Sequence, residues 1–177
     1  PTNDPIHSNG YKVSWIATDE WMKYTLDVSV GGLYDIEMRV SVGDVAGMVH
    51  FDVDGTDVST YTELPLSGLP GGWQTVTIED VYLEEGPVGL TFRADEGGFE
   101  VSHFDISFTG IPASQVDMGF VNAKTLTAQS VQLTLNKPLQ LPLQSGTNGF
   151  TLYADGAPLT LLGYSVPAGA DRVIVFE

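Results

Sequence analysis

The chain has 177 residues, 42% of them hydrophobic, and carries 23 acidic against 7 basic side chains, a formal net charge of −16. This charge argues against a nucleic-acid partner and against an anionic membrane surface, because both are bound through lysine and arginine. The lack of cysteine excludes disulfides, zinc–thiolate sites and thiol nucleophiles. The acidity fits a soluble protein that is secreted or held at the cell surface, and either calcium use or solubility alone explains it.

Hydrophobic residues recur with a period of two, which predicts β-strands. In residues 34–42, YDIEMRVSV, apolar side chains alternate with Asp35, Glu37 and Arg39. Residues 49–53 alternate in the same way and end at Asp54-Gly55, a common hairpin turn. Residues 88–94 and 99–108 also read as strands, glycine and proline punctuate the gaps, and no long helix is evident. We therefore predict an all-β protein, a β-sandwich with antiparallel sheets.

The composition changes near Gly110, where TGIPASQVD reads as a linker. Beyond it the acids become sparse and the predicted strands are short and rich in leucine and threonine. We predict one domain over residues 1–110 and a second, smaller and incomplete β-sandwich over residues 111–177. About sixty residues give a small core, so the second unit either packs on the first or continues beyond Glu177. Both ends look like cuts through a longer protein.

Three tryptophans are candidates for either the core or a binding surface. Trp73 ends the segment LPGGW, directly after two glycines, and so lies in a predicted loop. A large aromatic side chain has no evident core to fill there, so we expect Trp73 to be exposed. Trp15 lies within a predicted strand, and both a core role and a ligand role remain open. For Trp21 we prefer core packing. Asp19 and Glu20 are interpreted as a solvated turn, and the scattered histidines lack the spacing of a metal site.

A resemblance to a known family supports a ligand role. The run KVSWIATDEWMKYTLDVSVGGLYDIEMRVS, then GGWQTV and FEVSHFDISF, resembles the successive motifs of family 6 carbohydrate-binding modules from about Gly10 to Thr109. The resemblance implies a jelly-roll β-sandwich. It also implies that Trp15 and Trp73 clamp a sugar, with Glu100 where the family has an asparagine and Tyr11 lining the same cleft, and that Trp21 occupies a buried tryptophan position of the family. An ionised carboxylate accepts but cannot donate hydrogen bonds, so Glu100 would favour a ligand that offers paired hydroxyls, and its charge would repel an acidic sugar.

The start of the chain departs from the family pattern. The family opens with a strand carrying acidic residues that help to hold a structural calcium, and this chain begins too late to contain it. The resemblance still implies a calcium site, to which Asp105 would contribute from the last strand. Residues 111–177 resemble bacterial immunoglobulin-like modules, through VQLTLNKPL and GFTLYADG.

The residues favour binding over catalysis. Indole faces bind the apolar faces of sugar rings, and carboxylates bind the hydroxyl edges. No nucleophile motif and no glycine-rich phosphate loop is present, so we predict a protein that is not an enzyme. The resemblance implies a neutral polysaccharide or oligosaccharide as ligand (xylan, β-glucans and agar-type galactans are candidates) and a covalently linked glycoside hydrolase as partner. The alternative is a structural spacer or adhesion module of a large secreted protein, with its indoles buried.

Overall fold

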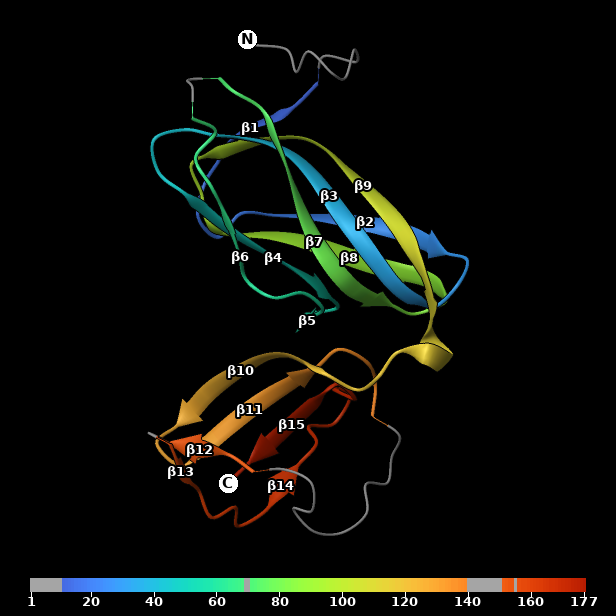
Figure 1. Ribbon diagram of the computed structural model, residues 1–177, viewed down its shortest axis with the longest axis vertical. Coiled ribbons are helices and arrows are strands. Elements are labelled where there is room, and N and C mark those ends of the chain that lie inside the picture. The colour runs from blue at the N-terminus through green and yellow to red at the C-terminus, as the bar shows by residue number, and fades with distance from the viewer. Residues whose placement is uncertain (1–10, 69–70, 140–150, 155) are drawn as a thin grey trace. The chain divides into compact units, whose positions relative to one another are not determined.

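The protein is built almost entirely of β-strands that form two compact units. Figure 1 shows the computed structural model, which describes residues 11–68, 71–139, 151–154 and 156–177. Unit 1 comprises Pro1–Asp117 and unit 2 comprises Met118–Glu177. The division therefore follows Asp117, beyond the boundary at residue 110 that the sequence suggested. A single 3-10 turn, η1 (Ala113–Gln115), follows the last strand of unit 1.

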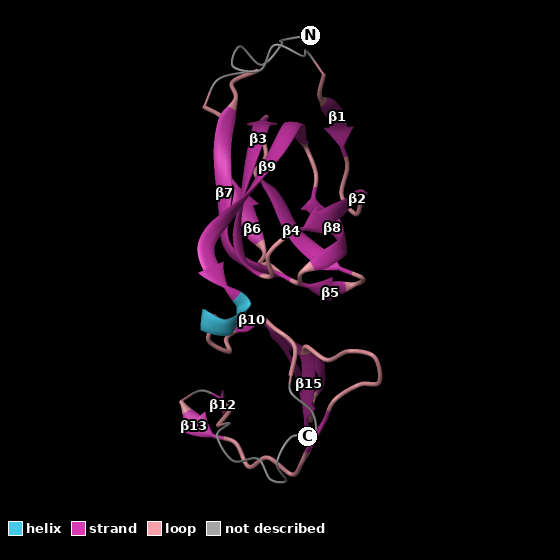
Figure 2. Ribbon diagram, turned by 90° about the vertical axis from the view of Figure 1, so that its right-hand side faces the viewer, coloured by secondary structure: helices cyan, strands magenta, loops and turns pink. Residues whose placement is uncertain are grey.

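Unit 1 is a sandwich of two antiparallel sheets. Figure 2 shows β7, β3 and β9 on one side and β4, β8 and β2 on the other. The first sheet has the order β1-β9-β3-β7, from β1 (Val13–Ile16), β9 (Phe99–Pro112), β3 (Gly32–Val42) and β7 (Gln74–Leu83). The second sheet has the order β2-β8-β4-β5, with β6 also pairing β4, from β2 (Trp21–Val28), β8 (Gly86–Glu96), β4 (Gly47–Val53), β5 (Thr56–Asp57) and β6 (Thr62–Leu64).

The predicted alternation fills the space between these sheets. Ile36, Met38 and Val40 of β3 are fully buried. Phe92 of β8 packs edge-on against Phe51, with ring centroids 5.7 Å apart. Burying each such side chain contributes about 1.5–3 kcal/mol. The all-β sandwich prediction is therefore confirmed, and its core joins both sheets.

One strand differs from the simple alternation. In β4 the alternation puts His50 and Asp52 on the face opposite Val49, Phe51 and Val53, yet both polar side chains are buried, at 5% and 1% exposed. The Tyr61 ring lies 4.5 Å from the His50 ring, and Arg93 Nε donates to Asp52. The turn after β4 is the predicted one, because Asp54 and Gly55 both have positive φ, at 50° and 84°.

The edge of the sandwich between β2 and β9 is open. A cavity of about 300 Å³ lies there, walled by Met22, Tyr24 and Leu26 of β2 and by Phe104 and Ile106 of β9, among others. Among the described residues, β2 pairs only with β8 and so forms a sheet edge. Trp21 at its start is 60% exposed, so the prediction that it packs in the core is wrong. The sequence pattern cannot tell that β2 is an edge strand.

The described residues of unit 2 form a four-stranded sheet and a separate hairpin. Leu133, Leu135, Ile174 and Phe176 form its buried core. Residues 140–150 and Asp155 lie outside the described residues, so the GFTLYADG segment is seen only in part. Among the described residues, no helix has the length and hydrophobicity to cross a bilayer. The sheet has the order β10-β11-β15-β14, from β10 (Phe120–Thr127), β11 (Ser130–Leu135), β15 (Val173–Phe176) and β14 (Tyr164–Ser165). The hairpin consists of β12 (Tyr153–Ala154) and β13 (Ala157–Pro158).

Candidate functional site

Strand register brings the predicted site residues onto one line across the first sheet. β1 pairs Val13 with Val101 and Ile16 with Phe99, so Trp15 lies beside Glu100. Glu100 pairs with Ser41 of β3. Gln74 of β7 pairs with Val40, which puts Trp73, just before β7, level with Ser41. Trp15 and Trp73 therefore stand at opposite edges of a four-stranded sheet, three strand spacings or about 14 Å apart at the backbone.

The backbone at Trp15 turns its indole out of the sheet. The register shifts between Val13 and Ile16, and Trp15 has φ of 64°, in the left-handed region that a bulky residue rarely occupies. Its side chain is 91% exposed, so it contacts its neighbours only slightly. A strained, solvated indole gains nothing for the fold, and such strain is typical of functional positions.

The loop after β1 is fixed against the β8–β9 turn, which holds Trp15 in place. Gly98 N donates to Ile16 O at 2.8 Å, and Asp19 N donates to Ala94 O at 2.8 Å. A Cβ on Gly97 would lie 2.4 Å from the Ala17 carbonyl carbon. Only glycine therefore allows this close approach of two backbones.

Trp73 is less exposed than the sequence suggested. Its ring is half-buried, with Lys12 Nζ 5.9 Å from the ring centroid. Because Lys12 comes from the far side of the sheet, just before β1, this contact spans the face of the sheet. Trp73 Nε1 is buried and is the one side-chain donor or acceptor of the described residues that is buried without a hydrogen-bond partner.

Glu100 is paired rather than free. Lys12 Nζ donates to Glu100 Oε2 at 2.5 Å, and the two side chains are 22% and 27% exposed. The structure therefore joins Lys12, Trp73 and Glu100 into one cluster. Sequence reasoning missed Lys12, although strand alternation places Lys12 and Ser14 on the face opposite Val13. That alternation, with so few basic residues in the chain, is the signal that could have found it.

The remaining predicted site residues lie outside this cluster. Tyr11 directly precedes β1 and is 81% exposed. The Asp105 side chain is 63% exposed, with His103 Nε2 at 3.5 Å. Calcium takes six to eight oxygen ligands, and the described residues contain no group of three or more acids or histidines that could hold a metal. The described surroundings of Asp105 therefore do not fit the predicted calcium.

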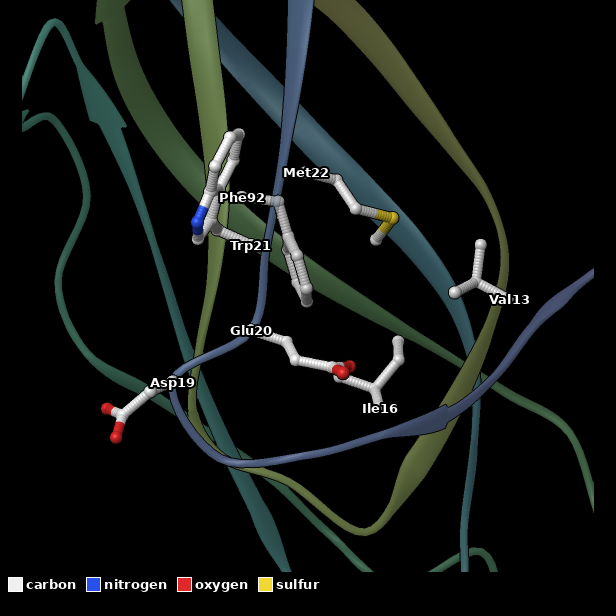
Figure 3. Close-up of a pocket in the computed structure, with 7 residues that line it drawn as sticks. All are labelled: Val13, Ile16, Asp19, Glu20, Trp21, Met22 and Phe92. Carbon is white, nitrogen blue, oxygen red and sulfur yellow. The ribbon is translucent and has the colours of Figure 1, made fainter.

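A second cavity, of about 380 Å³, lies beside the β1–β2 loop. Figure 3 shows the Glu20 side chain pointing toward the cavity that Ile16 and Phe92 also line, while Asp19 points away from these residues. Glu20 Oε2 accepts a hydrogen bond from Ala17 N at 3.0 Å, so this carboxylate stabilises the β1–β2 loop. Trp21 forms another wall of this cavity, which makes it an exposed indole away from the Lys12 cluster.

Comparison with known proteins bears on unit 1. The sequence profile of carbohydrate binding module family 6 matches residues 2–110. The fold is similar to that of the C-terminal module of this family from LamC, a marine laminarinase of Zobellia galactanivorans: TM-score 0.52, 26% identity, 57% of this chain and 83% of that one covered. It is also similar to the module CBM6cm-2 of Cellvibrio mixtus lichenase 5A in complex with cellotriose: TM-score 0.50, 24% identity, 55% and 77% covered. No curated protein matches the chain. The chain belongs to family 6 of the carbohydrate-binding modules.

Proposed function

We propose that unit 1 binds a neutral polysaccharide without cleaving it, through Trp15, Trp73 and Glu100. Trp15 carries this proposal. An indole that is 91% exposed on a left-handed backbone costs folding energy and is explained by a ligand that stacks on it. A structural spacer would instead bury its indoles, which does not fit Trp15. The family itself is a non-catalytic binding family.

The chemistry of the cluster supports a sugar ligand. The faces of a pyranose ring are apolar and its edge carries hydroxyls. Trp73 offers an aromatic ring 5.9 Å from Lys12 Nζ, and Glu100 offers an acceptor that Lys12 Nζ contacts at 2.5 Å. Aromatic rings with a few fixed polar groups are sufficient to bind a small part of a polymer. Tyr11, 81% exposed just before β1, is a further aromatic side chain that a longer ligand could reach.

The related modules suggest the ligand class and the partner. One was solved with cellotriose, and the other belongs to a laminarinase. We therefore place β-glucans first among the candidate ligands. We also propose that the unit lies in a secreted or cell-surface protein and keeps an attached glycoside hydrolase at its substrate, which raises the effective substrate concentration.

Calorimetry with laminari- and cello-oligosaccharides tests this function. Trp73→Ala and Trp15→Ala should each weaken binding at least about tenfold, or ~1.4 kcal/mol. Trp21→Ala is the matched control, because it removes a 60% exposed indole outside the cluster and should leave affinity unchanged. The parent protein should release no reducing ends from the same glycans. Equal binding by all three variants, or sustained turnover, would disprove the proposal.

A further inference from the structure

The Lys12–Glu100 pair stands in an unusually acidic unit. Unit 1 carries 4 basic and 20 acidic side chains, so it holds the whole net charge of −16, while unit 2 carries 3 of each. Of those four cations, Lys23 pairs with Asp54 at 3.2 Å and Arg93 pairs with Asp52. Lys12 is the one that reaches Trp73 and Glu100 together.

Together, Lys12 and Glu100 offer both hydrogen-bond donors and acceptors, which neither side chain offers alone. An ionised carboxylate accepts hydrogen bonds and an ammonium donates three, while a sugar hydroxyl does both. With Nζ and Oε2 2.5 Å apart, one hydroxyl can accept from Lys12 while it or its neighbour donates to the second carboxylate oxygen. Both side chains are about one quarter exposed, so these atoms remain within reach of a ligand. Hydrogen bonds to charged groups are the stronger ones.

We infer that Lys12 is a ligand-binding residue that, with Glu100, makes the site select neutral sugars that present neighbouring hydroxyls. This inference rests on the proposed function of unit 1. Glu100 neutralises the ammonium, and the surrounding acids repel anions, so a uronate or sulfate gains nothing at this position. The ammonium beside the Trp73 ring then donates to the rim of the sugar that stacks on that ring.

Lys12→Met tests the inference, because methionine keeps an unbranched apolar stem beside Trp73 and removes only the ammonium. We expect calorimetry with laminari- and cello-oligosaccharides to show binding about tenfold weaker, with an unchanged thermal midpoint. Lys12→Arg should retain most of the affinity. Lys23→Met, which removes the other lysine of a lysine–carboxylate pair in unit 1, should bind like the parent. Glu100→Gln should weaken binding of neutral sugars and, because it leaves the Lys12 ammonium without its neutralising carboxylate, improve binding of uronate-containing oligosaccharides relative to neutral ones.

Two results would overturn the inference. If Lys12→Met binds neutral sugars as well as the parent, the ammonium does not contact the ligand. If it binds them better, the ammonium occupies the face of Trp73 on which the sugar stacks. If the parent prefers a uronate-containing oligosaccharide and Lys12→Met loses that preference, Lys12 is an anion receptor. Failure of the proposed function looks different, since the parent would then bind no glycan and Trp73→Ala would change nothing.

Discussion

The two units differ in charge and in the size of their cores. Unit 1 buries twenty hydrophobic residues between two sheets and carries the net charge of −16. Unit 2 is neutral overall, and the core cluster among its described residues contains four buried residues. The family match, residues 2–110, lies within unit 1. The acidity that marks the whole sequence is therefore a property of the binding unit, whose large core tolerates the self-repulsion of its charges.

The largest expected effect comes from truncating one large core side chain in each unit. Phe92→Ala in unit 1 should cost about 3–5 kcal/mol, because Phe92 is 1% exposed and packs against Phe51 and Phe99. Phe176→Ala should destabilise unit 2 by a similar amount, since Phe176 is 2% exposed and packs in the buried cluster of the described residues with Leu133, Leu135 and Ile174. All three tryptophans lie in unit 1, so tryptophan fluorescence during urea unfolding reports unit 1 alone. A fluorescence midpoint that shifts equally in both variants would show that the units unfold together.

Gly97→Ala should have the next largest effect, confined to unit 1. The new Cβ would lie 2.4–2.6 Å from backbone atoms of Ala17, Thr18 and Ile16, so the β1 loop must move, at about 1–3 kcal/mol. We expect a lower urea midpoint together with weaker sugar binding, because Trp15 moves with the loop. Gly43→Ala is the control, since its nearest contact would be 3.8 Å away. Similar losses for both variants would contradict this close-approach argument.

A smaller effect tests the strain at Trp15. A glycine within a strand normally makes a protein less stable than an alanine does. At φ of 64° the order is reversed, because glycine has no Cβ to clash in the left-handed region. Trp15→Gly should therefore be more stable than Trp15→Ala by about 1 kcal/mol, measured by urea unfolding. Both variants should lose the same sugar affinity. If the alanine variant is the more stable one, Trp15 does not hold the left-handed conformation.

The smallest expected effect is the pH dependence of unit 1. Burial lowers the pKa of His50, but hydrogen bonds and charges from Asp57 and Asp95 outweigh it and raise this pKa above 6.5. Asp95 Oδ2 lies 2.7 Å from His50 Nδ1, and Asp57 Oδ1 lies 3.4 Å from His50 Nε2. The Tyr61 ring packs against the His50 ring, and the Arg93–Asp52 ion pair lies next to His50 in the sheet.

The folded state therefore holds the His50 proton more tightly than the unfolded state. This stabilisation is complete below pH 6.5 and is lost as the pH rises through the raised pKa. The fluorescence midpoint in urea should fall over that range in the parent protein. His50→Gln should remove this part of the slope, and a slope that persists unchanged would show that other groups cause it.

The sequence predicted the fold class and most strands of unit 1 because burial there follows a period of two. It could not predict which strands form sheet edges. Trp21 was placed in the core because the family resemblance implies a buried tryptophan there, whereas here it begins an edge strand and is 60% exposed. Lys12 was missed because its partners lie on β9 and before β7, and their pairing depends on register. Trp15 and Glu100 came from the family resemblance, and their roles stay predictions. Asp105 was expected at a calcium site that its described neighbours do not support.

Strand β9 gives unit 1 a direct path for mechanical load. Glu100 lies near its first residue, and its last residue, Pro112, leads through η1 to unit 2. Under the proposed function, tension between a glycan held at Glu100 and the chain that follows Pro112 would run through the covalent backbone of β9 itself. The hydrogen-bond ladder between β9 and β3, with ten register pairs, would not have to break for this load to be carried. The same strand that presents the carboxylate would thus act as the mechanical tether of the module.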